Sequence, residues 1–162
     1  MTARAALVLA VAAALAAPAA AGARAQETLT IKVTSISVTL KEHDVGKKGA
    51  SKGDTVFFRD DLLNAKAQFG KTKGAKVGKD RGTMTFTGAH AAVYKGSTTL
   101  PGGTILLSGQ VMTAPDGASL VIPVTGGTGR FKGATGILLV GPGKTRSLNT
   151  YVMKLPASGP VA

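Results

Sequence analysis

Apolar and polar side chains alternate along most of the chain after residue 26, in short runs closed by glycine, proline, asparagine or aspartate. Such runs with a period of two place one apolar row on one face of an extended strand. They predict strands over residues 28–40, 54–63, 77–90, 92–100, 104–112, 119–125, 136–141 and 145–156. Strands repeated about every ten residues are typical of an all-β sandwich or a closed barrel.

Glycine recurs inside these predicted strands, at Gly82, Gly88, Gly96, Gly109 and Gly136. Interior glycines weaken a flat sheet but permit the sharp coiling that closes a barrel. We therefore predict an all-β fold, an eight-stranded antiparallel β-barrel. It forms a single domain over residues 26–156, followed by a C-terminal tail at 157–162.

The first strand has an irregular alternation. Its early apolar residues, such as Val33, fall on odd positions, whereas Ile36 and Val38 fall on even ones. Side chains with a period of two cannot change face without an extra residue. A bulge or bend is therefore predicted at 34–35.

The first 25 residues have a different pattern, an apolar stretch at 5–17 preceded by Arg4 and followed by alanines. The stretch is short for a bilayer span, and Ala23 and Ala25 suit cleavage after Ala25. We predict a signal peptide over 1–25 and a secreted protein. Cleavage after Ala23 fits as well, and an uncleaved alanine-rich anchor is the alternative. The sequence has no cysteine, so a core rather than disulfides must stabilise the fold.

The charge is strongly positive, with 20 Lys and Arg against 8 Asp and Glu and a formal net charge of +12. Such a chain is attracted to polyanions, including anionic wall polymers and membrane surfaces. Aromatic residues make up 4% and tryptophan is absent, so the stacking platforms of single-strand binders are missing. We expect no specific nucleic-acid partner.

A basic segment between the second and third strands concentrates part of this charge. One interpretation is a polyanion-contact surface, and the other is a solvated loop that keeps the barrel soluble. The residues predicted for polyanion contact are Lys71, Lys73, Lys76, Lys79 and Arg81.

The stretch VTGGTGRFKGATG at 124–136 resembles a phosphate-binding loop in its glycines and basic residues. Its glycine spacing fits neither the dinucleotide nor the P-loop pattern. A strand rather than a helix is predicted after it, so no helix N-terminus is available to hold an anion. We interpret it as a special strand connection in which Phe131 closes one end of the core.

These residues also carry a family resemblance. The stretch at 124–140 resembles the motif GGTGxFxGARG of the allene oxide cyclase and dirigent barrel superfamily, and of its secreted bacterial members in particular. Further segments resemble the family's strands and hairpin in the same order: GDTVFFRDDLL (53–63), VGKDRGTMTFTG (77–88), LPGGTILLSGQ (100–110) and TRSLNTYVMKL (145–155). The resemblance implies an eight-stranded barrel with an apolar cavity, assembled as a homotrimer.

The chemistry of that superfamily is only partly matched. Plant cyclases close an allene oxide into a cyclopentenone, and dirigent proteins orient two phenoxy radicals. Against the cyclase pattern, this chain has Thr39 for a carboxylate, Lys41 for an amide, Met84 for a cysteine and Asp60 for an asparagine. The RDD segment at 59–61 resembles the dirigent DDP segment. However, Leu62 replaces its proline, and Lys132 and Thr135 replace its arginines.

Asp60 and Asp61 are therefore the predicted catalytic residues. As neighbours in a strand they point to opposite faces, so one can enter the barrel. A carboxyl in an apolar cavity would have a raised pKa and could act as an acid or base. The alternative is a strand end exposed to water. The predicted cavity residues are Phe58, Met84, Phe86, Tyr94 and Tyr151.

His43 and His90 are far apart in the sequence and have no metal-ligand companions, so we predict no metal site and no cofactor. Two functions remain open. The first is a secreted barrel that holds a small hydrophobic molecule and directs its cyclisation or coupling, an isomerase-like or dirigent-like activity. The second is a non-catalytic exported structural or polyanion-binding surface module. A cavity with an inward Asp60 or Asp61 favours the first, and a lumen filled by Phe57, Phe58, Met84 and Phe86 favours the second.

Overall fold

The computed structural model describes residues 26–46, 49–112, 119–143 and 145–156. The predicted signal peptide, the predicted C-terminal tail and a turn that the sequence APDG at 114–117 predicts all lie outside these residues. The helical structure in the described ranges has neither the length nor the apolar character of a bilayer-spanning helix.

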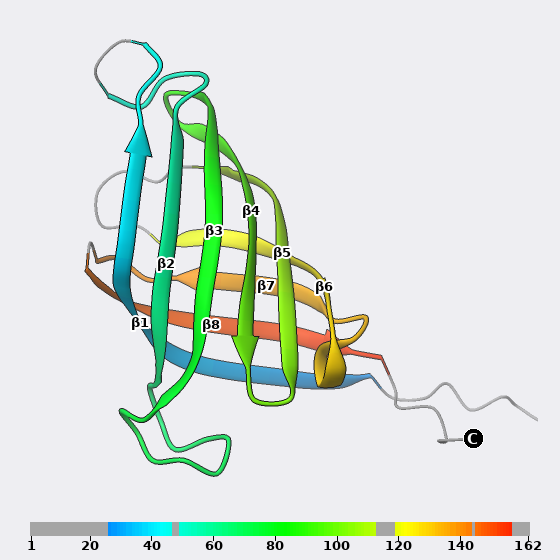
Figure 1. Cartoon of the computed structure of the whole chain (residues 1–162). Coiled ribbons are helices and arrows are strands. Elements are labelled where there is room, and N and C mark those ends of the chain that lie inside the picture. The colour runs from blue at the N-terminus through cyan, green and yellow to red at the C-terminus, as the bar shows by residue number, and fades with distance from the viewer. Residues whose placement is uncertain (1–25, 47–48, 113–118, 144, 157–162) are drawn as a thin grey trace, which may run out of the picture.

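The described residues form eight strands and a single-turn 3-10 helix, η1. In order, they are β1 (Glu27–His43), β2 (Thr55–Asn64), β3 (Lys76–Gly88), β4 (Ala91–Leu100), β5 (Gly103–Met112), β6 (Leu120–Gly127), η1 (Gly129–Phe131), β7 (Thr135–Val140) and β8 (Arg146–Leu155). Each strand pairs with the next in antiparallel fashion, and β8 pairs back with β1, so the sheet is a closed barrel (Figure 1). The predicted eight-stranded antiparallel barrel is confirmed.

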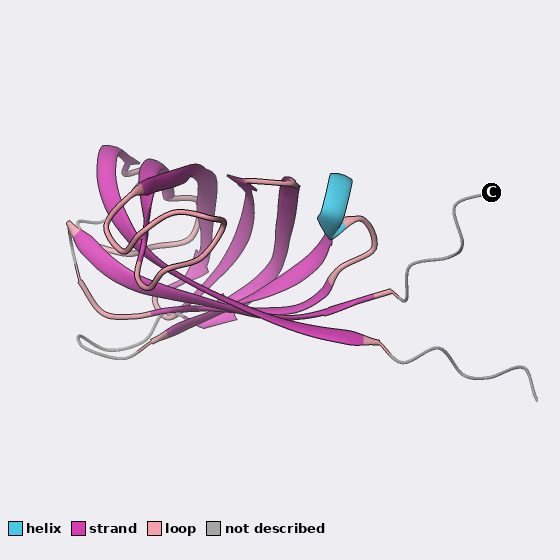
Figure 2. Ribbon diagram, turned by 90° about the horizontal axis from the view of Figure 1, so that it is seen from below, coloured by secondary structure: helices cyan, strands magenta, loops and turns pink. Residues whose placement is uncertain are grey.

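Strand β1 closes the barrel because it is long and curved, and it pairs with β8 and with β2 (Figure 2). Its register is irregular between Ser37 and Thr39, and not at 34–35 as predicted. The prediction was wrong because it assumed that only apolar residues face inward. Ser35 is buried at 2% exposure, and its hydroxyl bonds Asp60 inside the barrel. The apolar Val38 is instead 59% exposed.

The apolar core fills the end of the barrel that η1 covers. The fully or nearly fully buried side chains there include Ile31, Leu62, Leu100, Ile105, Leu107, Val124, Phe131 and Met153. They come from the early part of odd-numbered strands and the late part of even-numbered ones, which meet at the same end of an antiparallel barrel. The opposite end is therefore left for a cavity.

The glycine-rich connection lies against the β4–β5 turn, backbone to backbone. The N–H of Arg130 donates to the carbonyl of Gly102 at 2.7 Å, and Thr128 donates to Thr104 at 2.7 Å. A Cβ on Gly103, which has φ of 153°, would collide with the Thr128 carbonyl. Glycine is thus required for this close approach. No α-helix follows within residues 119–143, and Phe131 is wholly buried, so the stretch is a strand connection.

Candidate ligand cavity

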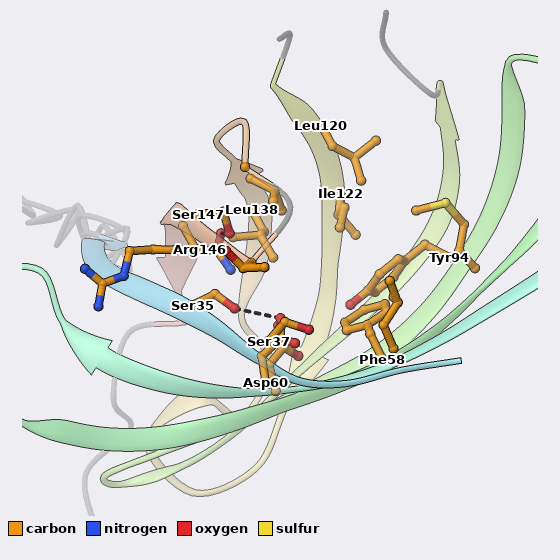
Figure 3. Close-up of a pocket in the computed structure, with 17 residues that line it drawn as sticks. Ser35, Ser37, Phe58, Asp60, Tyr94, Leu120, Ile122, Leu138, Arg146 and Ser147 are labelled. Carbon is orange, nitrogen blue, oxygen red and sulfur yellow. Dashed lines mark hydrogen bonds between the residues drawn. The ribbon is translucent and has the colours of Figure 1, made fainter. Parts of the chain in front are cut away.

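A cavity of about 180 Å³ lies in the barrel at the end away from η1 (Figure 3). One wall is apolar and comes from β6 and β7, with Leu120, Ile122, Leu138 and Val140. The facing wall is polar and comes from β1, β2, β3 and β8, with Ser35, Ser37, Asp60, Asp80, Ser147 and Asn149. A molecule bound here would meet hydrocarbon on one side and hydrogen-bonding groups on the other.

Two carboxyl groups dominate the polar wall. Asp60 on β2 lies directly opposite Asp80 on β3 in the antiparallel register, and both line the cavity. Directly opposite residues have Cβ atoms about 4.5–5.5 Å apart. Asp80 is 3% exposed, and Asp60 is half-buried. The barrel therefore holds a pair of acids side by side at the edge of an apolar space.

Hydroxyl groups hold each carboxyl in place. Ser35 Oγ donates to Asp60 Oδ2 at 2.6 Å, and Thr98 Oγ1 donates to Asp80 Oδ1 at 3.3 Å. The Tyr151 hydroxyl lies 2.9 Å from Thr98 Oγ1. When Asp80 is ionised, Thr98 gives its one hydroxyl proton to Asp80, and Tyr151 is then the donor to Thr98. A buried chain of three groups thus orients the Asp80 carboxyl.

The surroundings change how these acids titrate. Burial raises the pKa of Asp80 to about 7, the charge of Asp60 acts in the same direction, and the hydrogen bond from Thr98 opposes them. Burial also raises the pKa of Asp60, against the hydrogen bond from Ser35. Near neutral pH the Asp80 carboxyl is therefore populated in both its protonated and its ionised form. An acid in that range can both give and take a proton.

No cationic side chain pairs with either acid among the described residues, whose ion pairs are Lys76–Asp61 and Arg130–Glu27. Arg146 borders the cavity, but its guanidinium points away from Asp60 in Figure 3. Unpaired buried carboxyls retain protons because desolvation disfavours their charge. The pair is thus free to interact with a ligand.

Two glycines make room for the aromatic end of the cavity. Gly82 and Gly96 lie opposite each other on β3 and β4. A Cβ on Gly82 would lie 2.6 Å from the Phe58 ring, and one on Gly96 would lie 2.7 Å from the Tyr94 hydroxyl. The Phe58 and Tyr94 rings, with centroids 5.6 Å apart, occupy this space. The strand glycines therefore shape the site as well as the barrel.

Three of the predicted cavity residues line the cavity, namely Phe58, Met84 and Tyr94. Tyr151 is fully buried behind the acids and touches them only through Thr98. Phe86 lies elsewhere, in a second hollow of about 240 Å³ beside His43 and Asp54. The reason is its position farther along β3, near the open end of the barrel, two residues beyond Met84.

The two predicted catalytic acids separate as expected for neighbours in a strand. Asp60 lines the cavity, whereas Asp61 lies on the outside, where Lys76 Nζ donates to its Oδ2 at 2.5 Å. Lys76, at the start of β3, thus forms an ion pair with Asp61. Lys71 and Lys73 lie in the β2–β3 loop, and Lys79 and Arg81 point outward from β3.

Sequence reasoning missed Asp80. Asp80 stands between Lys79 and Arg81 in the basic segment, where an acid is readily taken for a surface residue. A usable signal was present: Met84 was placed on an inward face, and counting back in steps of two from it reaches Gly82 and then Asp80. Among the described residues, no group of three or more His, Asp or Glu is placed to hold a metal ion.

The comparisons with known proteins agree with the barrel fold. A family model described as an allene oxide cyclase barrel-like domain matches residues 33–152. The chain belongs to this family. The resemblance to its motifs is therefore confirmed. A search of curated proteins found no match.

Several solved structures share this allene oxide cyclase-like barrel. A pyocyanin demethylase is 25% identical over 77% of this chain and 99% of its own, with a TM-score of 0.64. A Diels–Alderase from Streptomyces koyangensis is 22% identical over 87% of this chain and 74% of its own, with a TM-score of 0.64. A pterocarpan synthase dirigent protein is 15% identical over 80% of this chain and 87% of its own, with a TM-score of 0.58. The last two likenesses show the fold alone.

Proposed function

We propose that the cavity binds a small, largely apolar molecule that presents one oxygen or nitrogen atom to Asp60 and Asp80. The pair then directs an isomerisation or cyclisation of that molecule by proton transfer. The observation that carries the proposal is the unpaired carboxyl pair on the polar wall of a cavity whose facing wall is apolar. The alternative interpretation of Asp60 was a strand end exposed to water. That interpretation predicts an exposed carboxyl, whereas Asp60 is half-buried.

The size of the cavity limits the ligand. A dry cavity of about 150 Å³ holds benzene in an engineered protein. At about 180 Å³ this one has room for one ring and its substituents. A larger molecule must extend past Leu40 and Arg146, which border the same space. We therefore expect ligands of one or two rings.

The proton inventory defines the reaction class. Asp80, whose pKa burial raises to about 7, donates a proton from its protonated form to the ligand heteroatom. Asp60, held by Ser35, accepts a proton released from a carbon of the same ligand. One proton enters and one leaves, so the product is an isomer of the substrate. The adjacent carboxyls then exchange the proton and restore the starting state.

The related proteins support a chemical role for the barrel. One similar structure is a demethylase of pyocyanin, and others are a Diels–Alderase and a cyclase that catalyses a cycloaddition. Each is named for a reaction, and each has the fold that this chain shares. The second hypothesis, a non-catalytic module, predicted a lumen filled by side chains, and the cavity beside Asp60 favours the first.

The test uses a panel of one- and two-ring ketones and phenols with hydrocarbons of the same shape, measured by native mass spectrometry and titration. We expect the ketones to be retained over the hydrocarbons, more tightly as the pH falls through about 7 and Asp80 gains its proton. In Asp80→Asn this pH dependence should vanish. Asp61→Asn is the matched control and should keep the wild-type profile. Equal retention of ketones and hydrocarbons would overturn the proposal.

Proton transfer is tested separately, as deuterium uptake at carbon by a bound ketone in heavy water. Asp60→Asn and Asp80→Asn should each slow the uptake roughly 100-fold, the usual size of a general acid–base contribution. Asp61→Asn should slow it by less than about twofold. If deuterium uptake is equal in all three variants, the proposal that Asp60 and Asp80 transfer protons is wrong, and only the proposal that the cavity binds a ligand stands.

Secretion and a homotrimer complete the proposed setting. Support for assembly comes from the outer face of β5–β8, where Leu106, Val121, Ile137 and Leu148 are 37–50% exposed. Large exposed apolar patches usually mark interaction sites. Light scattering of the purified domain should give three times the monomer mass, and a monomer at micromolar concentration would contradict it.

A further inference from the structure

The outer face of β2, β3 and β4 carries a cluster of uncompensated positive charges, and these strands lie side by side in Figure 1. We call it the basic face and define it by Arg59, Lys79, Arg81 and Lys95, which are all exposed. Within residues 59–97 the chain has eight Lys and Arg. Two of the three acids there, Asp60 and Asp80, are turned into the barrel.

Two arginines of the basic face lie directly opposite each other. Arg59 on β2 pairs with Arg81 on β3 in the register. Like charges at directly opposite positions destabilise a sheet. No acid forms an ion pair with either arginine among the described residues. Two facing arginines that destabilise the sheet and have no acidic partner in the described residues indicate that an anion from outside the protein binds here.

Lys79 extends this cluster along β3. It stands on the same face two residues before Arg81, about 6.6 Å away along the strand. Its cross-strand neighbour is Asp61, but Asp61 Oδ2 already accepts a hydrogen bond from Lys76 at 2.5 Å. The Lys79 ammonium is thus left facing solvent beside the arginines.

A groove of about 540 Å³ runs over these residues, lined by Arg59, Lys79, Arg81, Ser97 and Thr99. Arg81 Nε donates to Ser97 Oγ at 3.3 Å, which holds the guanidinium over the groove. The hydroxyls of Ser97 and Thr99 add neutral hydrogen-bonding groups. The β2–β3 loop, which carries Lys71 and Lys73 and leads into β3, projects from the barrel in Figure 1.

We propose that the basic face binds a linear polyanion whose charged groups are phosphates, seated first between Arg59 and Arg81. Each guanidinium offers a planar fork of donors that matches the oxygens of a phosphate. Two arginine forks with a lysine ammonium beside them offer several donors, which suit the oxygens of a tetrahedral phosphate better than the two oxygens of a planar carboxylate. A row of cations that follows β3 into the loop suits a polymer better than a single ion.

This site lies on the outer side of the barrel wall whose inner side faces the cavity, and Asp80 borders both spaces. The inference therefore goes beyond the proposed function and does not depend on it. It also moves the polyanion contact predicted from the sequence. The centre of the contact is the sheet surface at Arg59 and Arg81, and the loop lysines extend it.

Long-chain inorganic polyphosphate is the probe, titrated against the full barrel at low and moderate salt. The double variant Arg59→Gln and Arg81→Gln should bind roughly tenfold more weakly, with a salt slope smaller by about two. The double variant Arg59→Lys and Arg81→Lys keeps the charge but loses the guanidinium forks. Its affinity should lie between that of the wild type and that of the glutamine double variant. The control Lys32→Gln and Lys154→Gln removes the same charge from exposed positions on β1 and β8.

A control pair that weakens binding as much as the arginine pair would overturn the proposal, because net charge alone would then explain it. If orthophosphate bound as tightly as polyphosphate at equal phosphate concentration, the claim that the basic face prefers a polymer would be wrong. Poly-glutamate binding as tight as polyphosphate would overturn the phosphate preference. We expect wild-type protein to melt at a higher temperature with polyphosphate, and the arginine double variant to gain nothing.

Discussion

The inner and outer faces of β2 and β3 carry opposite charge within the same few residues. Arg59, Asp60 and Asp61 follow one another on β2, and the middle residue points inward. Lys79 and Arg81 flank Asp80 in the same way on β3. The wall is thus acidic inside and basic outside, because successive side chains of a strand alternate between faces.

Asp60 and Asp61 show what this difference means for chemistry. Asp61 meets water and Lys76, and its side chain has the ordinary role of a surface ion-pair partner. Asp60 meets Ser35 and the apolar cavity, and burial raises its pKa. Identical neighbouring residues therefore acquire separate roles from the barrel wall alone. Predictions that exchange or remove charges on either face can sharpen this comparison.

The largest expected effect is on the inner face. The Asp80 pKa is about 7 in the folded protein against an ordinary 3.8, so the folded state binds more protons between those values. The free energy of unfolding must therefore fall as pH rises from about 4 to 7 on account of this residue. Asp80→Asn has no carboxyl to ionise, so it avoids this fall in the free energy of unfolding. It should therefore be about 2–4 kcal/mol more stable than the wild type at pH 8.

Urea unfolding of wild type and Asp80→Asn at several values between pH 5 and 8 measures the effect as a difference that grows with pH. Asp61→Asn is the control, and it should change stability by less than about 0.5 kcal/mol because its ion pair is partly exposed. A constant difference between wild type and Asp80→Asn would mean that Asp80 titrates normally. If Asp80→Asn is more stable than the wild type but slower in proton transfer, the buried Asp80 carboxyl lowers stability and serves the reaction.

A smaller effect concerns the space behind the acids. In Gly96→Ala the new Cβ would lie 2.7 Å from the Tyr94 hydroxyl and 2.8 Å from the backbone carbonyl of Arg81. We expect a loss of about 1–3 kcal/mol, as for other overpacked interiors. Gly88→Ala is the matched strand control, since no atom lies within 4 Å of its added Cβ. Thermal melting of both proteins distinguishes them, and equal melting points would refute the account of Gly96.

The smallest effect concerns the outer face. Arg81→Gln removes the like-charge contact with Arg59 and should stabilise the free protein by about 0.2–1 kcal/mol at low salt. Salt screens such exposed charges, so the gain should shrink at high ionic strength. Denaturant midpoints at low and high salt give the comparison. A destabilised Arg81→Gln would contradict the cost assigned to the two arginines that face each other.

The sequence alone determined the fold. Period-two runs, strand glycines and the family motifs were enough for an eight-stranded barrel, because alternation and turn residues are local properties of the chain. They also placed Asp60 and Asp61 on opposite faces. The Ser35 position was not determined in this way, because an inward serine breaks the rule that inward residues are apolar.

Only the tertiary structure decided the site. The acid pair exists because the β2–β3 register sets Asp60 opposite Asp80, and the sequence shows no such register. The buried chain from Tyr151 through Thr98 joins residues 53 positions apart. Closure of the sheet brings these groups together and removes water from them, and that desolvation changes ordinary carboxyls into groups that can exchange protons near neutral pH.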